Sequence, residues 1–385
     1  MKIDDEVTVR TEAVAHGGFV VARSNGIVLF VRLALPDELV KVKIIKSAPG
    51  GRAWVGEAIE ILEASPYRIT PRCEYFKASG CGGCDFQHST IDYQLEMKKF
   101  VLIEQMQRLA KLEVGDLIQT HQLSPKDFNW RSKVRLAPND AGFLGYRKFR
   151  SHEIIKIENC PIAIEPINQK IKQLSQEKFR KEQIFVLRNQ LVKQVNEKSD
   201  IQVYTTLLGV KFTHMASGFW QSHLQAAEKL ASLVLAKVEF QARALDLYAG
   251  VGVFGRLLIE QQKISNLDSV ELDKAATKCA IRNFRGLANA RAISDRAERF
   301  LLNTDQKYDL VILDPPRKGL GEAVAQRLAK VATSQIIYVA CDPASLARDS
   351  RVLITAGWHL SQLDLVDAFP QTHHSETVAV FSSEK

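Results

Sequence analysis

Apolar and polar residues alternate through the N-terminal part of the chain, which is the pattern of half-buried β-strands. Five such runs are separated by Gly, Asn-Gly or Pro, which favour turns: residues 7–14, 17–26, 27–35, 38–48 and 53–64. Five short strands predict a small β-barrel of the OB type over residues 1–63. Barrels of this kind carry oligonucleotides in many proteins, but a purely structural barrel has the same pattern.

The period changes to that of a helix in residues 91–112, where apolar side chains recur on one side. This side is formed by Leu95, Phe100, Ile103, Met106 and Leu109. Strand-like segments with interleaved basic and aromatic residues follow, and Arg131, Lys133 and Arg135 alternate so that they share one strand face. Aromatic residues such as Trp130 suit stacking on RNA bases, although a packed hairpin with an aromatic face explains them equally.

From about residue 241 the pattern alternates between short apolar strands and helical segments. The predicted strands are 242–250, 266–273, 308–316 and 335–343, with helical segments such as 274–287 and 321–332 between them. This order predicts an α/β domain with an open, mainly parallel, doubly wound sheet. Ligands bind beyond the carboxyl ends of the strands in such sheets. The polar residues expected there are Tyr248, Glu271, Asp314 and Cys341.

The length of 385 residues indicates two to three domains, which we predict at residues 1–63, 64–210 and 211–385. Residues 71–211 carry 23 basic and 16 acidic side chains, so +7 of the net charge of +8 lies in this segment. A nucleic-acid-binding segment is expected to show such an excess, although a well-solvated surface also produces it. No run approaches the roughly 18 apolar residues of a membrane span, and the acidic start is unlike a signal peptide. We therefore expect a cytoplasmic protein with no membrane association.

A glycine-rich turn follows the first strand of the predicted α/β domain. Gly250, Gly252 and Gly255 form G-x-G-x-x-G, which dinucleotide enzymes and methyltransferases share. Glu271, 21 residues after Gly250, is placed to accept hydrogen bonds from both ribose hydroxyls of a nucleoside cofactor. Asp314 begins an Asp-Pro-Pro turn, which is typical of methyltransferases at this sheet position and favours S-adenosylmethionine (SAM) over NAD. A turn-forming role alone is the alternative for Asp314.

Two residues of the same domain are candidates for covalent and acid–base chemistry. Cys341 ends a predicted strand at the cleft end of the sheet, where a thiol is placed for nucleophilic attack. An inert buried cysteine is the alternative, and Cys279, inside a helical segment, is interpreted that way. Glu376 in the C-terminal segment is a candidate general base. The adjacent His373 and His374 are interpreted as structural or surface residues.

Four other cysteines have the spacing of a metal site. Cys73, Cys81 and Cys84 form C-x7-C-x2-C, and Cys160 follows at a distance. Gly80, Gly82 and Gly83 allow the backbone to wrap closely around a cluster and to direct amides at its sulfur atoms. Zinc competes with iron–sulfur for such a site, and spacing alone does not choose between them. Six cysteines in a chain of this length indicate a reducing compartment and not a secreted disulfide scaffold.

Taken together, these motifs resemble the RNA uracil-5 methyltransferases that carry an iron–sulfur cluster, over nearly the whole chain. Residues 1–63 resemble their TRAM domain. The other similar motifs are CGGCDFQH, WRSKVRLAP, LGYRK, IENCPI, GFWQSH, DLYAGVG, LDPPRKG, YVACDPASLARD and HHSETVAVF, in that order. The chain departs from the family pattern at His223, at Asp342 and in the spacing of Cys73 and Cys81, which is two residues longer than usual.

The resemblance implies a role for each site residue. Cys341 is implied to be the nucleophile that attacks carbon 6 of uracil, and Glu376 the general base that removes the proton from carbon 5. The residues implied to contact SAM or to lie beside it are Gln221, Tyr248, Gly250, Glu271, Asp295 and Asp314. The residues implied to hold a [4Fe–4S] cluster are Cys73, Cys81, Cys84 and Cys160.

Members with a TRAM domain and a cluster typically act on the large ribosomal subunit, so the resemblance implies 23S rRNA as the substrate of a monomeric enzyme. The T-loop uridine of tRNA is the alternative. An amino-group methyltransferase acting on adenine or guanine also fits the Asp-Pro-Pro turn, but it needs no cysteine nucleophile. A non-catalytic RNA-binding or redox-sensing protein is a third hypothesis.

Overall fold

The computed structural model describes residues 1–47, 53–125, 127–188, 191–196 and 199–383. The chain forms two compact units, and each is assembled from separate segments. The first unit comprises Met1–Val101, Pro125–Gln183 and Phe369–His374, and the second comprises Leu102–Ser124, Ile184–Ala368 and Ser375–Lys385. The division at residues 63 and 210 stays a prediction. Residue 48 of the fourth predicted strand lies outside the described residues.

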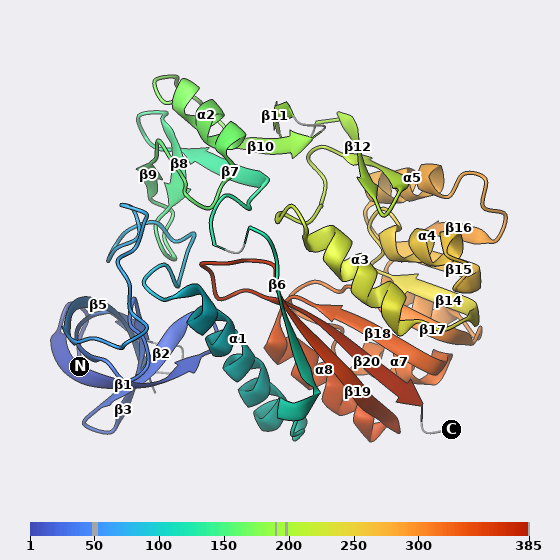
Figure 1. Ribbon diagram of the computed structural model, residues 1–385, viewed down its shortest axis with the longest axis horizontal. Helices are drawn as coiled ribbons and strands as arrows, with labels where there is room; N and C mark the ends of the chain where they lie inside the picture. The colour runs from blue at the N-terminus through green and yellow to red at the C-terminus, as the bar shows by residue number, and fades with distance from the viewer. Residues whose placement is uncertain (48–52, 126, 189–190, 197–198, 384–385) are drawn as a thin grey trace. The chain divides into compact units, whose positions relative to one another are not determined.

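The first unit begins with a closed five-stranded barrel, which confirms the expected OB-like architecture (Figure 1). Its strands, in the order β1-β2-β3-β5-β4, are β1 (Glu6–Ala15), β2 (Phe19–Ser24), β3 (Ile27–Arg32), β5 (Ala53–Glu63) and β4 (Leu39–Ser47). Asn25 and Gly26 both have positive φ, 49° and 78°, and they join β2 to β3 in a tight hairpin. Alternating apolar residues such as Leu29, Val31 and Val42 fill the interior.

The rest of the first unit carries the cysteine segment and a small antiparallel sheet. Its regular elements are most of α1 (Ile91–Gln105), then β7 (Lys133–Pro138), β8 (Leu144–Arg147), β9 (Ile154–Lys156) and α2 (Glu165–Gln173). The predicted helix is therefore confirmed as α1, which the π-helix η1 (Met106–Ala110) extends. Leu95 and Met106 of the predicted apolar side are buried, whereas Phe100 is exposed, and Met97 and Leu102 are buried in addition.

The second unit is an α/β domain built on an eight-stranded sheet, as the strand–helix alternation predicts (Figure 1). The strand order is β16 (Ala290–Ser294), β15 (Ile264–Glu271), β14 (Gln241–Leu247), β17 (Tyr308–Leu313), β18 (Ala332–Ala340), β20 (Glu376–Ser383), β19 (Trp358–Asp367) and β6 (Ile118–Gln122). The first five strands are parallel, and β20 is antiparallel to both of its neighbours. β6 adds to the edge beside β19, a pairing that the sequence did not predict.

Helices connect the parallel strands, and two hairpins precede them. The helices are α3 (Ala226–Lys237), α4 (Val253–Glu260), α5 (Lys274–Asn283), α6 (Ala297–Asn303), α7 (Glu322–Val331) and α8 (Pro343–Thr355). The hairpins are β10 (Gln183–Arg188) with β11 (Leu191–Val195), and β12 (Gln202–Leu207) with β13 (Val210–Met215), and η2 (Gly115–Leu117) is a short 3₁₀ turn. No helix in the described part of the chain combines the length and apolar composition needed to cross a membrane.

Candidate active site

The candidate residues of the second unit line up along one edge of its sheet. Strands β14, β15, β17 and β18 are parallel, so their carboxyl ends meet at that edge. Leu247 pairs with both Val270 and Leu313, which places the next residues, Tyr248, Glu271 and Asp314, side by side. Sequence patterning thus located this edge correctly, because each candidate follows or ends an apolar strand.

Cys341 and Glu376 come together at the same edge although 35 positions separate them in the sequence. Ala340, the last residue of β18, pairs with Thr377 of the antiparallel strand β20. One step further in this register sets Cys341 opposite Glu376. Residues opposite one another in an antiparallel pair have neighbouring side chains on one face. The register therefore brings the thiol and the carboxyl group together.

Local sequence fixes the backbone around Cys341. Asp342 caps α8, since its side chain accepts a hydrogen bond from Ser345 N at 2.8 Å, and Pro343 suits the first helical turn. The chain must therefore leave β18 at Cys341. The facing 314–321 turn is held by buried Asp349, which accepts hydrogen bonds from Leu320 N at 2.7 Å and from the Tyr338 hydroxyl at 2.8 Å.

Burial and negative charge keep the candidate thiol protonated. Burial, followed by the charges of Glu376 and Asp314, raises the pKa of Cys341 to about 12, and Arg317 opposes this shift. Burial, followed by the charge of Asp314, raises the pKa of Glu376 well above its ordinary value. Burial also raises the pKa of Asp314 to about 7. A carboxyl group with a raised pKa is suited to exchange protons near neutral pH.

Glu376 is also short of hydrogen bonds. Its side chain is 3% exposed, and its Oε2 atom has no hydrogen-bond partner among the described residues. A buried carboxyl oxygen without a partner costs free energy, so such a group needs an explanation. A reacting substrate that offers a proton to this oxygen supplies one.

A cleft lies beside this edge, lined by Gln221, Tyr248, Gly250 and Asp314. Glu271 does not line it directly, but its Oε2 accepts a hydrogen bond from Gly250 N at 2.9 Å. The remaining lining is mostly apolar and was not predicted from the sequence: Phe219, Trp220, Ala227, Leu230, Ala249, Val251, Val253 and Phe254. Phe219 and Trp220 belong to the GFWQSH motif, and their place in this motif was the sequence signal that could have identified them as cleft residues.

Asp295 is the candidate that the structure does not bring to this cleft. Its Oδ1 accepts hydrogen bonds from Arg296 N at 2.6 Å and from Arg299 Nε at 2.5 Å. Its backbone N donates to Glu271 O at 3.1 Å, so Asp295 lies beside the carboxyl end of β15. Its contact with SAM stays a prediction.

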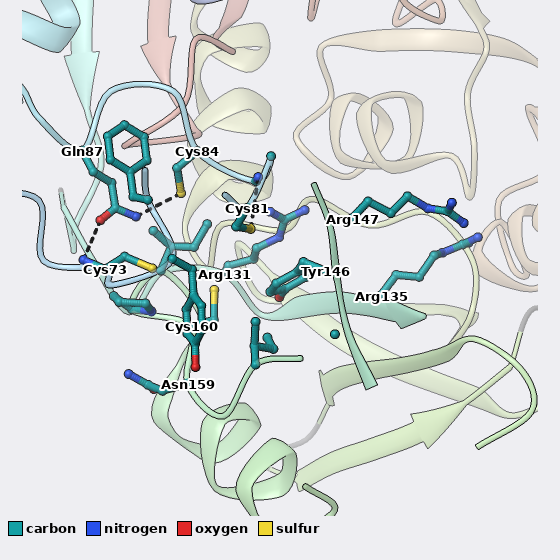
Figure 2. Close-up of a pocket in the computed structure, with 18 of the residues that line it drawn as sticks. Cys73, Cys81, Cys84, Gln87, Arg131, Arg135, Tyr146, Arg147, Asn159 and Cys160 are labelled. Atoms are coloured by element: carbon teal, nitrogen blue, oxygen red, sulfur yellow. Dashed lines mark hydrogen bonds between the residues drawn. The ribbon is translucent and has the colours of Figure 1, made fainter. Parts of the chain in front are cut away.

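The four spaced cysteines line one cavity of about 310 Å³ in the first unit, and Figure 2 shows their sulfur atoms around a common space. Gln87 bridges two of them, because Cys73 N donates to its Oε1 at 3.1 Å and its Nε2 donates to Cys84 Sγ at 3.2 Å (Figure 2). Burial raises the pKa of Cys81 to about 11 and that of Cys84 well above its ordinary value. Across the described residues, no three His, Cys, Asp or Glu side chains form a group that holds a metal ion.

Cationic side chains share this cavity, whereas one predicted stacking residue does not. Arg131, Arg135 and Arg147 line the cavity. Trp130 is only 1% exposed and meets Phe369 edge-on at 6.2 Å between ring centroids. The packed alternative therefore holds for Trp130, and the prediction that it stacks on RNA bases is wrong.

Comparison with known proteins decides the family. A family model described as tRNA (uracil-5-)-methyltransferase matches residues 255–384. An RNA methyltransferase of Streptomyces avermitilis, named as uncharacterized, is 32% identical over 98% of this chain and 98% of its own length. A likewise named protein of Treponema denticola is 30% identical over 97% of this chain and 98% of its own. The chain belongs to the RNA uracil-5 methyltransferase family. It is thus a SAM-dependent enzyme that modifies RNA.

A solved structure of this family has the same fold. It is the Pyrococcus abyssi tRNA (uracil-54, C5)-methyltransferase in complex with S-adenosyl-L-homocysteine. The match has a TM-score of 0.74 at 22% identity and covers 98% of this chain and 100% of that one. It confirms the fold of this methyltransferase, including the SAM-type α/β domain.

Arg317 and Asp349 are the polar residues of the methyltransferase edge that sequence reasoning missed. Arg317 follows the Asp-Pro-Pro turn in LDPPRKG, and its charge acts on both Cys341 and Glu376. Asp349 lies within α8 and resembles an ordinary helical surface residue in the sequence. The position of Arg317 within a motif was a usable signal, whereas Asp349 had none.

Proposed function

We propose that this enzyme transfers a methyl group from SAM to carbon 5 of one specific uridine in 23S rRNA, through a covalent bond between Cys341 Sγ and uracil carbon 6. The register that sets Cys341 opposite Glu376 is the observation that supports this mechanism. A methyltransferase acting on an amino group requires neither residue at this place.

The proposed reaction proceeds by addition of Cys341, methyl transfer from SAM, and elimination assisted by Glu376. The Cys341 thiol loses its proton to water, the resulting thiolate adds to carbon 6, and the electron pair of the C5–C6 double bond becomes available at carbon 5 as an enolate. Carbon 5 then takes the methyl group from the SAM sulfonium, and S-adenosylhomocysteine leaves. Glu376 accepts the proton of carbon 5, the C5–H pair reforms the double bond, and the C6–S bond breaks to return the thiolate. The uracil has to leave its stack to reach both groups, which costs a few kcal/mol.

The SAM-binding role is assigned to Gln221, Tyr248, Gly250, Glu271, Asp295 and Asp314. Four of these residues line the cleft beside the edge. The carboxylate of Glu271 is held by Gly250 N at 2.9 Å and by Asp273 N at 2.6 Å, which presents it at the strand end. A carboxylate at this position accepts hydrogen bonds from ribose hydroxyls.

The four-cysteine cavity is assigned to a [4Fe–4S] cluster, with zinc as the competing occupant. Two observations support this assignment: four thiols line one cavity, and Gly83 N and Gln87 Nε2 point at the sulfur atoms of Cys81 and Cys84. A bound cluster would supply four bonds that tie together separate points of the chain. The methyl transfer does not need an electron, so no step of the reaction is assigned to it.

The choice of RNA rests on different grounds. A barrel together with a four-cysteine site resembles members that act on 23S rRNA, which is our first assignment. The family model and the archaeal structure are both named for tRNA, so the T-loop uridine is the second. We assign the predicted barrel of residues 1–63 and the basic segment of 64–210 to RNA binding, residues 211–385 to catalysis, and the enzyme to the cytoplasm as a monomer.

Two experiments test this function. Cys341→Ala should abolish methylation and covalent trapping on 5-fluorouridine RNA while RNA binding persists, because only the nucleophile is removed. Cys279→Ala is the matched control, since Cys279 is buried within α5. Full turnover by Cys341→Ala would refute the mechanism. Mapping 5-methyluridine in rRNA and tRNA from cells lacking the enzyme then decides between the two substrates.

A further inference from the structure

The loop of residues 368–375 joins β19 to β20 and leads directly into Glu376. Its two ends are fixed by the pairing of Val366 with Glu376. Residues Phe369–His374 nevertheless belong to the first unit, whereas the strands belong to the second. Glu376 follows this loop directly, so the contacts that hold the loop act on the position of Glu376 together with its pairing to Val366.

Gln371, at the middle of the loop, is bonded through its backbone and its side chain to residues 85–94. Gln371 N donates to Gln94 Oε1 at 2.9 Å, and Gln94 Nε2 donates to Gln371 Oε1 at 3.0 Å. Gln371 O accepts from Asp85 N at 2.9 Å and from Phe86 N at 3.0 Å. Both glutamines are buried, with 0% and 3% exposure for Gln94 and Gln371. Every polar group of Gln371 except its Nε2 is thereby engaged in a dry environment.

The backbone of Gln371 is strained. Its φ of 69° lies in the left-handed region, which a residue with a side chain rarely adopts. Such a conformation persists only where the surroundings determine it, and these residues cluster at functional sites. Here the bonds to Gln94, Asp85 and Phe86 are what determines it.

Further contacts hold the rest of the loop in the same way. Lys98 Nζ donates to Phe369 O at 3.1 Å, and Asp85 Oδ2 accepts from His373 N at 3.1 Å. Gln94 is the centre of this arrangement, because its Nε2 also lies 3.0 Å from Phe86 O and from Ser89 O. The side-chain amide of Gln94 on α1 thus connects residues 86–89, which follow Cys84 in the chain, to the loop that precedes Glu376.

We propose that Gln94 is a positioning residue for the methyl transfer: through Gln371 it fixes the 368–375 loop and so holds Glu376 where it can take the proton from carbon 5. The inference rests on the proposed role of Glu376. When the base is misplaced, the thiolate can still add and carbon 5 can still take the methyl group. The carbon 5 proton is then not removed, the C6–S bond does not break, and the methylated covalent adduct accumulates.

The experiment compares Gln94→Leu with Gln105→Leu in the full-length enzyme. Both glutamines are buried on α1, but among the described residues the side chain of Gln105 bonds to Glu104 and Arg108 and not to the loop. We expect Gln94→Leu to lower kcat about tenfold to 100-fold, as for a base displaced by about 1 Å, with the KM for SAM unchanged. The fraction of enzyme bound covalently to unmodified RNA substrate should rise in the same variant. Gln105→Leu should match the wild type in both measurements.

The adduct separates a positioning role from simple damage. General loss of structure would lower adduct formation and turnover together, and that result, or wild-type turnover by Gln94→Leu, overturns the inference. Gln371→Asn provides a second variant, since Asn tolerates the left-handed conformation but is one methylene too short to accept the bond from Gln94 Nε2, whereas the bond from the backbone N of residue 371 to Gln94 Oε1 remains. It should show a smaller rise in adduct in the same direction. Failure of the wild-type enzyme to form any adduct would instead refute the proposed function.

Discussion

Replacing Arg32 with Met should loosen the cysteine segment from the barrel. Arg32 is fully buried on β3, and its Nη1 donates to Glu57 Oε1 at 2.9 Å. Its Nη2 donates to the carbonyl oxygens of Cys81 at 3.2 Å and Cys84 at 3.0 Å. The same guanidinium lies 4.2 Å from the centroid of the Phe149 ring. Met fills a similar volume but makes none of the polar contacts.

The expected cost follows from the charge that the substitution leaves behind. Removing one partner of a buried ion pair strands the other, which costs about 3–5 kcal/mol. Glu57 is 4% exposed, and its Oε2 accepts from Ser79 N at 2.7 Å; because the carboxylate is buried, water does not replace Arg32 easily. At about 1.4 kcal/mol per factor of ten, the opened population should rise by roughly two to three and a half orders of magnitude.

Amide hydrogen exchange of the barrel strands in the full-length enzyme measures this population. Arg23→Met is the matched control, because Arg23 pairs with Glu12 at an exposed site where such pairs contribute about 0–1 kcal/mol. Adding Glu57→Leu to Arg32→Met should recover part of the loss, since the stranded charge disappears. Equal exchange in Arg32→Met and Arg23→Met would refute the reasoning.

Two further predictions concern the methyltransferase domain. The rate of covalent trapping on 5-fluorouridine RNA should rise with pH between about 6 and 9, because the raised pKa of Cys341 leaves a larger fraction of reactive thiolate at each higher pH; a flat profile contradicts this. Gly252→Ala should weaken S-adenosylhomocysteine binding at least tenfold by calorimetry, because Gly252 has φ 80° and its Cβ would lie 2.4 Å from Phe284 Cζ. Gly286→Ala, at φ 88° with nothing within 4 Å, is the control for backbone strain alone, and equal losses of binding would contradict the steric argument.

Short-range patterns accounted for the elements and for most of the candidate residues. Alternation at period two predicted the five barrel strands, and Asn25-Gly26 marked their tightest turn. In the α/β domain, Tyr248, Glu271, Asp314 and Cys341 each stood at the end of an apolar strand, and parallel strands necessarily gather their carboxyl ends at one edge. Tyr248, Asp314 and Cys341 were therefore locatable from the sequence alone.

The sequence by itself determined which residues are candidates for the chemistry and that Tyr248, Glu271, Asp314 and Cys341 lie at the ends of apolar strands, because burial, turns and helix caps are encoded within a few neighbouring positions. Tertiary structure alone decided that Cys341 faces Glu376, that β6 extends the sheet, that Trp130 is buried and that Gln371 is bonded to Gln94. These are partnerships between residues far apart in the chain. A hydrogen-bond partner or packing neighbour at that separation leaves no local pattern, so only the folded backbone, with its register and its strained turn at Gln371, specifies it.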